Sequence, residues 1–399
     1  MMILSRIVLL SAAALVALPM AATPKQAQAQ KVRGVTKSEV IIGMHTDLSG
    51  PAASYGVTSS NGIRMRFDEI NEAGGINGRK LRLIVEDSQY QVPRAVQAVN
   101  KLINRDGIFL MAGALGTPMN NAVMADQLKA NVPNMFPLTA ARQMHEPMHR
   151  LKFASGSTYY EQMRIGIKWM VEKKGKQKVC SLYQDTDFGQ EIFQAARDQT
   201  QAMKIALVET ATNKPADTDF TAQIAKLRGA GCDLIASGSI VRDAILPYAT
   251  ARKMGWMDVD FIGQSASYDQ IVASAPGGVT EGFYTMAGTI LPYRDTAPAH
   301  LVAWIDKYKE KYKSDVNIGS VYGYALADMI AIGIERGGKD LTVDKFIAGM
   351  ESIKGYRDIF GGPIVDFGPN KRQGSNSSFL FQVQKAKFIL IDGPVHLGS

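Results

Sequence analysis

The residues with the clearest catalytic spacing are His-Glu-Pro-Met-His at positions 145–149, a literal H-E-x-x-H motif. On a continuous helix this spacing puts both histidines on one face, where they bind zinc while the glutamate acts as general base. Pro147 lies inside the motif, and proline breaks a helix unless it occupies the first turn. Residues 151–154 read as an extended segment immediately afterwards. We therefore expect a surface loop without a metal ion, and an exported zinc hydrolase is only an alternative.

Two other segments resemble catalytic motifs without completing them. Residues 333–340 have the glycine and lysine spacing of a phosphate-binding loop, but Asp340 occupies the position that needs Ser or Thr, and a helix precedes it. Residues 263–267 lack the last glycine of a nucleophile elbow. The five histidines show no helical arrangement that would activate a serine. We therefore expect no enzyme, no catalytic residues and no cofactor.

The elements around these segments favour ligand binding. A strand at 40–43 is followed by a Ser/Gly-rich loop, a helix from 61 to about 72, and the pair Gly74-Gly75, where a positive φ ends the helix. An alternating strand follows at 80–85. In a parallel sheet, the loops at the carboxyl ends of the strands are where ligands bind.

Strands and helices alternate through most of the chain, which predicts parallel sheets. The first series has strands at 39–46, 80–86, 108–113 and 132–136, with helices at 57–73, 93–104 and 117–129. After a break near 155, the second has helices at 159–173, 188–202, 217–229 and 241–254 and strands at 178–183, 205–210, 232–237 and 259–263. The remainder is predicted to hold a strand near 282–285, helices at 297–313, 319–336 and 342–353, and strand runs at 359–366 and 378–391. The predicted fold class is therefore α/β, with two doubly wound parallel-sheet lobes.

The N-terminus predicts export. Arg6 precedes an apolar run at 7–18, and an A-x-A site ends at Ala29, so residues 1–29 read as a cleaved secretory signal peptide. The run of about twelve apolar residues is too short to span a bilayer, which needs ~20. An uncleaved anchor is the alternative. No later segment is expected to cross a membrane, so the mature chain is predicted to be periplasmic.

Charge and cysteine content exclude little else. The net charge of +8 is spread over separate clusters, with no basic stripe between stacking aromatics, so we expect no nucleic-acid binding. The only cysteines are Cys180 and Cys232, each at the start of a predicted strand. They could pair in an oxidising compartment or remain buried free thiols.

Several short motifs together resemble one family, the branched-chain-amino-acid type of periplasmic solute-binding protein. They are Ile42-Gly43, Ser49-Gly50-Pro51, Tyr55-Gly56, the segment 70–79, Glu86-Asp87, the segment 113–117, Val132-Pro133, and the segments 187–189, 218–220 and 322–325. Their order covers almost the whole mature chain. The resemblance implies the capture subunit of an ABC importer, with an ABC permease as partner, and we expect a monomer. A sensor module that reports ligand to a receptor kinase is another possibility.

The resemblance also implies a fold and a mechanism. Its two lobes are joined by a three-crossing hinge and close on one ligand held between them. The first lobe would hold residues 30–155 and about 285–358, and the second would hold residues 156–284 and about 359–399.

Site residues follow from the same resemblance. In the first lobe, Gly116 and Thr117 would hold the ligand carboxylate, and the loop Leu138-Thr139-Ala140 would add backbone and hydroxyl donors. An anion is well placed at a helix N-terminus. Thr117 could instead be only an N-cap.

Apolar side chains would flank the ligand. Tyr55 matches the family aromatic of the first lobe, Phe188 matches that of the second, and Ile240 stands at a further aromatic position. Tyr55 could instead plug a loop, and Phe188 could belong to the core.

One departure from the family concerns the loop after the strand at 259–263. Amino-acid-binding members carry an acid there for the ligand ammonium, whereas this chain has Gln264-Ser265-Ala266. An unpaired buried ammonium costs several kcal/mol. We therefore expect a ligand with a carboxylate and no α-amino group, such as an aromatic or branched organic acid, with Ser265 beside it.

Nearby charged residues keep a second ligand class open. Asp185, Asp243 or Asp269 could replace the missing acid, which would permit an amino acid. Arg242 could add a second contact to an anion.

Overall fold

The computed structural model of the protein describes residues 32–398, and the predicted signal peptide at 1–29 lies outside the described residues. The strands of the described residues form two separate sheets, one of five strands and one of seven. Helices alternate with the strands along the chain. The predicted α/β fold class is confirmed.

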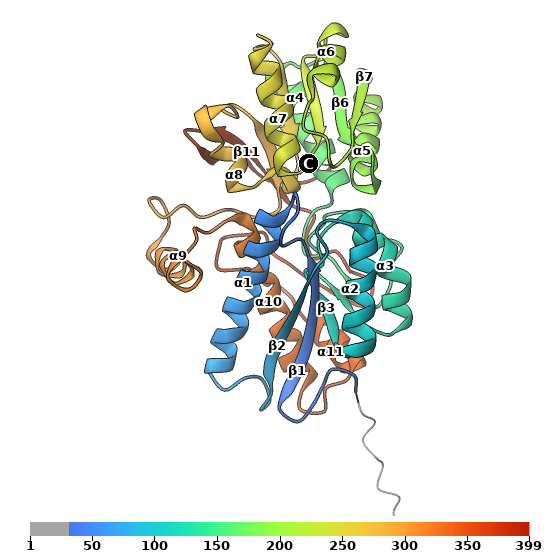
Figure 1. Cartoon of the computed structure of the whole chain (residues 1–399), viewed down its shortest axis with the longest axis vertical. Helices are drawn as coiled ribbons and strands as arrows, with labels where there is room; N and C mark the ends of the chain where they lie inside the picture. Colours follow the sequence, from blue (N-terminus) through green and yellow to red (C-terminus); the bar gives the residue numbers. More distant parts are fainter. Residues whose placement is uncertain (1–31, 399) are drawn as a thin grey trace, which may run out of the picture. The chain divides into compact units, whose positions relative to one another are not determined.

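The first sheet is entirely parallel, in the order β2-β1-β3-β4-β5. Helices cover both of its faces (Figure 1). Val40, Ile42 and Met44 of β1 pack in one apolar cluster with α1, whereas Ile41 packs in another with α2 and α3. The strands are β1 (Glu39–Thr46), β2 (Lys80–Asp87), β3 (Leu110–Ala112), β4 (Asn134–Met135) and β5 (Lys152–Phe153), and the helices are α1 (Ala53–Glu72), α2 (Val92–Asn100, extended by a π-helical turn at Lys101–Arg105) and α3 (Thr117–Lys129).

Two later helices, α10 (Ile318–Gly337) and α11 (Val343–Glu351), complete the first core. α10 lies against α1 at very short range, because a Cβ at Gly323 would come 2.1 Å from the carbonyl oxygen of Ser59. α10 is also long and apolar enough to cross a membrane, contrary to the expectation that no later segment is. Its apolar surface is explained by packing, since most of the helix is buried between α1, α11 and the sheet.

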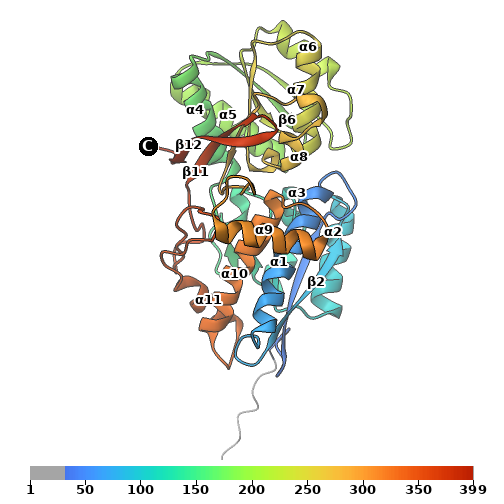
Figure 2. The ribbon, with the colours of Figure 1, turned by 90° about the vertical axis from the view of Figure 1, so that its left-hand side faces the viewer.

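The second sheet has the order β12-β11-β10-β9-β8-β6-β7 and is mixed. Five strands are parallel, and β11 and β12 add an antiparallel hairpin at one edge (Figure 2). The strands are β6 (Lys178–Gln184), β7 (Ala206–Asn213), β8 (Leu234–Gly238), β9 (Asp260–Gly263), β10 (Tyr284–Ala287), β11 (Ser378–Gln384) and β12 (Lys387–Val395). The helices are α4 (Tyr159–Lys174), α5 (Asp187–Met203), α6 (Thr221–Gly229), α7 (Val241–Lys253) and the short α8 (Gln270–Ala273).

Helix α9 (Ala299–Tyr312) lies across α1 (Figure 2). Two ion pairs hold the helices together: Lys307 Nζ lies 2.8 Å from Glu69, and Lys311 Nζ lies 2.6 Å from Asp68. Both pairs are partly exposed, so each contributes little to stability.

The predicted strand at 359–366 is wrong. This segment is a loop, in which the Asp358 carboxylate accepts hydrogen bonds from the backbone N–H groups of Phe360 and Gly362. Among the described residues, the segment 359–366 forms one isolated β-bridge, between Val365 and Tyr356, and no longer strand pairing. Phe367 then packs on Phe136 and Phe153 of the first core.

The predicted run at 378–391 is two strands rather than one. The turn between them contains Lys385 and Ala386, whose φ angles are 51° and 61°. Two successive positive φ angles suit a tight hairpin turn, but the usual signal for it is Asn-Gly or Asp-Gly. The sequence therefore carried no local sign of this turn.

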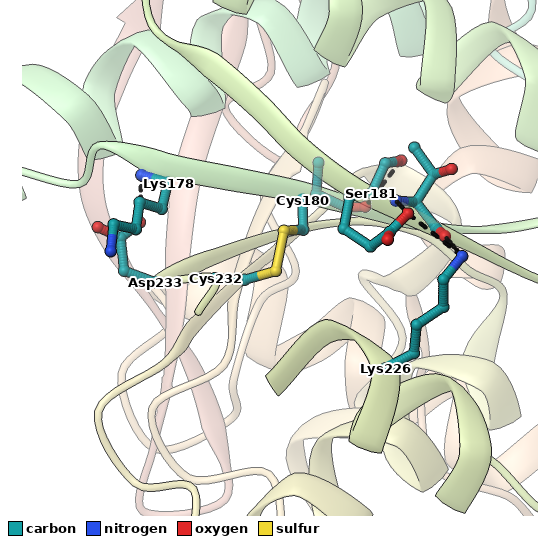
Figure 3. Close-up of a disulfide and its surroundings, with 9 residues drawn as sticks. Lys178, Cys180, Ser181, Lys226, Cys232 and Asp233 are labelled. Carbon is teal, nitrogen blue, oxygen red and sulfur yellow. Dashed lines mark hydrogen bonds and ion pairs between the residues drawn. A yellow bond between two sulfur atoms is a disulfide. The ribbon is translucent and has the colours of Figure 1, made fainter. Parts of the chain in front are cut away.

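A disulfide joins Cys180 of β6 to Cys232, just before β8 (Figure 3). The two strands are neighbours in the second sheet, and both cysteines are buried. Beside the bridge, the Asp233 carboxylate accepts hydrogen bonds from the backbone N–H groups of Gln177 and Lys178. Of the two open alternatives, the structure has the disulfide.

Candidate functional site

A cavity of about 120 Å³ is lined by loops that follow strands of both sheets. A single water needs only ~10–15 Å³ on this measure, so there is room for a small ligand. All nine residues proposed from the sequence line this cavity: Tyr55, Gly116, Thr117, Leu138, Thr139, Ala140, Phe188, Ile240 and Ser265. The structure therefore brings them together, although they come from six separate parts of the chain.

The polar end of the cavity is built on two threonines. Thr117 Oγ1 and Thr139 Oγ1 lie 2.6 Å apart, and both side chains are buried. Gly116 is the N-cap of α3, with φ at 93°, so Thr117 is the first helical residue and its hydroxyl does not cap the helix. Asn120 fixes the turn, because its amide donates to the carbonyl oxygens of Ala114 and Gly116. Hydroxyl groups and the free N–H groups of a helix start suit a carboxylate.

Tyr159 extends this polar end and was not predicted. Its backbone N–H donates to the carbonyl oxygen of Ala140 at 2.7 Å. Burial raises the pKa of its phenol to about 12, although the nearby Thr139 side chain and Ala140 backbone lower it. Its ring meets Phe188 edge-on, with the centroids 5.0 Å apart. Phe188 is therefore a core residue and a cavity residue at once. The sequence does mark Tyr159 as the first residue of a helix, because Thr158 and Glu161 form a capping box at the start of α4.

Aromatic rings form much of the remaining wall. Tyr55, in the first turn of α1, stacks with Tyr322 of α10 at a centroid distance of 6.2 Å. Burial raises the pKa of both phenols well above the ordinary value, so both stay neutral at any physiological pH. Tyr90, from the loop after β2, also lines the cavity.

The loop after β9 is held by uncharged groups. The Gln264 amide donates to the carbonyl oxygen of Ser239 and accepts from the N–H of Ala266. The N–H of Ser265 donates to Gln162 Oε1 at 2.8 Å. Ile240 is the N-cap residue of α7 and contributes an apolar side chain. This side of the cavity therefore offers no carboxylate to a ligand ammonium.

The acids considered as replacements lie elsewhere. Asp269 is hydrogen-bonded to Ser54, Asn317 and the N–H of Ile271. None of Asp185, Asp243 and Asp269 lines the cavity.

Asp243 and Arg242 are occupied with each other and with nearby groups. The Asp243 carboxylate accepts from the amides of Gln184 and Asn213, and Arg242 lies 3.4 Å from it. Arg242 also donates to the carbonyl oxygen of Pro215 and does not line the cavity. The suggested second anion contact is therefore not formed.

One acid was missed. Among the cavity-lining residues of the described chain, Asp358 is the single charged side chain. Its carboxylate already accepts backbone hydrogen bonds from Phe360 and Gly362, and burial raises its pKa. No sequence pattern marks this position, which lies immediately before the segment 359–366 that was predicted to be a strand.

The H-E-x-x-H segment is a loop, as predicted. A short 3-10 turn (Arg142–Met144) ends at His145, and Lys152 Nζ donates to the carbonyl oxygens of Gln143, Glu146 and Pro147. The two histidines therefore do not share a helical face. Among residues 32–398, no group of three or more His, Cys, Asp or Glu side chains could hold a metal ion.

Comparisons with known proteins agree with this geometry. A family model described as periplasmic binding protein matches residues 39–387. A leucine-, isoleucine-, valine-, threonine- and alanine-binding protein of Pseudomonas aeruginosa is 25% identical over 294 residues, which are 73% of this chain and 77% of the relative.

Solved structures share the fold. A branched-chain amino acid ABC transporter protein from Thermus thermophilus with bound valine has a TM-score of 0.82 and 16% identity, and the match covers 91% of this chain and 98% of that one. A fatty acid ABC transporter substrate-binding protein from Thermomonospora curvata has a TM-score of 0.79 and 21% identity, with 91% and 94% covered. The chain therefore belongs to the periplasmic binding protein family, as a type I solute-binding protein of the branched-chain-amino-acid-binding group.

Proposed function

We propose that this protein captures a small carboxylate-bearing solute, an aromatic or branched organic acid, and presents it to an ABC permease. The observation that carries the proposal is the pair of Thr117, at the start of α3, and Thr139, in a cavity that Tyr159 also lines and whose wall at the loop after β9 is uncharged. No chemistry on the solute is proposed, and the protein acts as a single chain.

The carboxylate would lie against Thr117 and Thr139. Each hydrogen bond to a charged group contributes ~1.5–3 kcal/mol. A micromolar dissociation constant needs about 8 kcal/mol in total. Three or four such bonds, together with burial of an apolar body between Tyr55 and Phe188, are enough to supply it.

The absence of an acid in the loop after β9 favours an organic acid over an amino acid. The one acid in the cavity lining, Asp358, is already hydrogen-bonded to backbone N–H groups, so it is a poor partner for an ammonium. The amino acids in the name of the Pseudomonas aeruginosa relative make them the alternative ligand class. A fatty acid is the alternative that the Thermomonospora curvata protein suggests.

Binding would be coupled to closure of two lobes. We propose that the first lobe holds residues 32–155 and 285 to about 374, because Phe367 packs in the first core. The second lobe would hold 156–284 and the C-terminal hairpin. A ligand that contacts both lobes selects the closed form.

Isothermal titration calorimetry with benzoate, 4-methyl-2-oxopentanoate and leucine tests this function. We expect micromolar binding of at least one acid and no binding of leucine. Tight leucine binding would refute the ligand class. If no solute bound, and small-angle scattering showed the same shape with every one, solute capture itself would be refuted.

A further inference from the structure

We propose that the cavity has a second, apolar compartment along α10, and that the solute is an elongated monocarboxylate whose uncharged tail occupies it. This inference rests on the proposed function, because the carboxylate at Thr117 and Thr139 fixes one end of the ligand. Beyond the proposed function, it specifies the length of the ligand and the polarity of the end that lies away from the carboxylate.

One face of α10 forms the floor of this compartment. Tyr322, Ala325, Leu326 and Met329 line the cavity, and their spacing of three, four and seven residues places them on the same side of the helix. Seven residues of α-helix rise about 10 Å. The cavity wall therefore continues for two helical turns from Tyr322 to Met329.

The two ends of this wall differ in character. Tyr322 belongs to the polar end, because it stacks with Tyr55 and its hydroxyl lies beside Gly288, next to the Ser157 hydroxyl. Met329 belongs to the apolar core cluster of the first sheet. The cavity thus leads from the threonine pair toward the first core.

The walls opposite α10 come from two other segments. Phe136 and Val365 line the cavity and are 1% and 7% exposed. Tyr356 adds its ring, since its hydroxyl is already hydrogen-bonded to Asp328 at 3.0 Å. The loop 136–139 connects the compartments, with Phe136 in the apolar one and Thr139 in the polar one.

This lining determines what the tail can be. A second carboxylate would be desolvated beside Leu326, Met329 and Phe136, and the cavity lining in the described chain has no cationic side chain to pair with it, which is strongly unfavourable. An aliphatic or aromatic tail would instead increase the affinity of the ligand, by about fourfold for each methylene group that is buried. Met329 is flexible and can adapt to tails of different shape.

A chain-length series tests the proposal on the unmodified mature protein. Calorimetry would compare propanoate, 3-phenylpropanoate, octanoate and the dicarboxylate octanedioate. We expect octanoate or 3-phenylpropanoate to bind at least tenfold more tightly than propanoate, and octanedioate to bind more weakly than octanoate. Equal affinity for short and long acids would overturn the second compartment while leaving carboxylate capture intact. If no acid bound, the proposed function would fail instead.

A variant locates the tail. Met329→Phe fills the compartment, so the ratio of long-acid to short-acid affinity should fall at least tenfold. Met350→Phe is the matched control, because Met350 is buried in the same core and does not line the cavity. Its ratio should equal that of the unmodified protein. An unchanged ratio in Met329→Phe would place the tail elsewhere, and if that variant did not fold, the length series alone would decide.

Discussion

The hydroxyl oxygens of Thr117 and Thr139 lie 2.6 Å apart, although the two residues follow different strands of the first sheet. Each hydroxyl has one hydrogen to donate and two lone pairs that accept. When the two hydroxyls are hydrogen-bonded to each other, one donates and the other accepts, so the direction of each O–H bond is restricted. Tyr159 adds a third hydroxyl near Thr139 in the cavity lining. The geometry therefore presents oriented, uncharged donors at the start of α3.

Thr117→Val should weaken carboxylate binding about tenfold or more, because it removes a hydrogen bond to a charged group worth ~1.5–3 kcal/mol. Calorimetry with the best acid found would measure the change. Thr200→Val is a suitable control, since Thr200 is buried in α5 and hydrogen-bonds only to the helix carbonyls of Ala196 and Arg197 in the described chain. An unchanged dissociation constant in Thr117→Val would remove this residue from the site.

Asp358→Asn distinguishes the two ligand classes. Asparagine keeps an oxygen for the N–H groups of Phe360 and Gly362, so the loop should remain folded. For an organic acid, we expect a change of no more than about threefold, as for substitutions without a direct partner. For an amino acid whose ammonium depended on Asp358, the loss would be about 3–5 kcal/mol, the cost of leaving one charge of a buried pair alone. A large loss would therefore contradict the proposed ligand class.

The fold was largely predictable because its signals are local. Alternating strands and helices, with turns at predictable places, fixed the βα order from β1 to β9. The C-terminal part was less predictable, because its conformation depends on tertiary contacts. The loop around Asp358 is stabilised by side-chain capping of its own N–H groups, and the turn at Lys385 and Ala386 lacks a turn sequence.

The cavity residues likewise divide into those that the sequence could predict and those that depend on tertiary contacts. Thr117 and Thr139 follow strands at positions where ligand loops are expected, so the sequence could point to them. Tyr159 lies where the chain passes from the first sheet to the second, whereas Asp358 lies in an irregular loop between two segments of the first core. Only the packed structure brings these two residues to the cavity. Tertiary contacts also exclude Asp269 as a partner for the ligand, because its buried carboxylate already accepts hydrogen bonds from Ser54 and Asn317.

The Cys180–Cys232 disulfide should contribute substantially to stability. It closes a loop of 52 residues, which in the chain-entropy model corresponds to about 4 kcal/mol. Urea unfolding with and without a strong reductant would measure the difference. The Cys180→Ala, Cys232→Ala double variant should match the reduced protein and show no response to reductant. Equal stability of oxidised and reduced protein would contradict this contribution.

Glu191 should make stability depend on pH. Its carboxylate is buried and accepts hydrogen bonds from the backbone N–H of Arg142 at 3.0 and 3.1 Å, next to the loop that carries Thr139. Burial raises its pKa to about 7, against 4.5 for the unperturbed group. Between these values the folded state holds the proton more tightly than the unfolded state. The associated stability is therefore fully present below about pH 4.5 and is lost as the pH rises to 7, by up to about 3 kcal/mol.

Glu191→Gln tests this pH dependence because glutamine keeps the shape and one acceptor but cannot titrate. The free energy of unfolding of the unmodified protein, minus that of the variant, should fall by up to about 3 kcal/mol between pH 4.5 and pH 8. Urea unfolding at intervals of half a pH unit would give this difference curve. Other titrating groups are common to both proteins, so their effects cancel. A flat curve would mean that the interaction with Arg142, whose Nε lies 3.4 Å away, fully offsets the burial of Glu191.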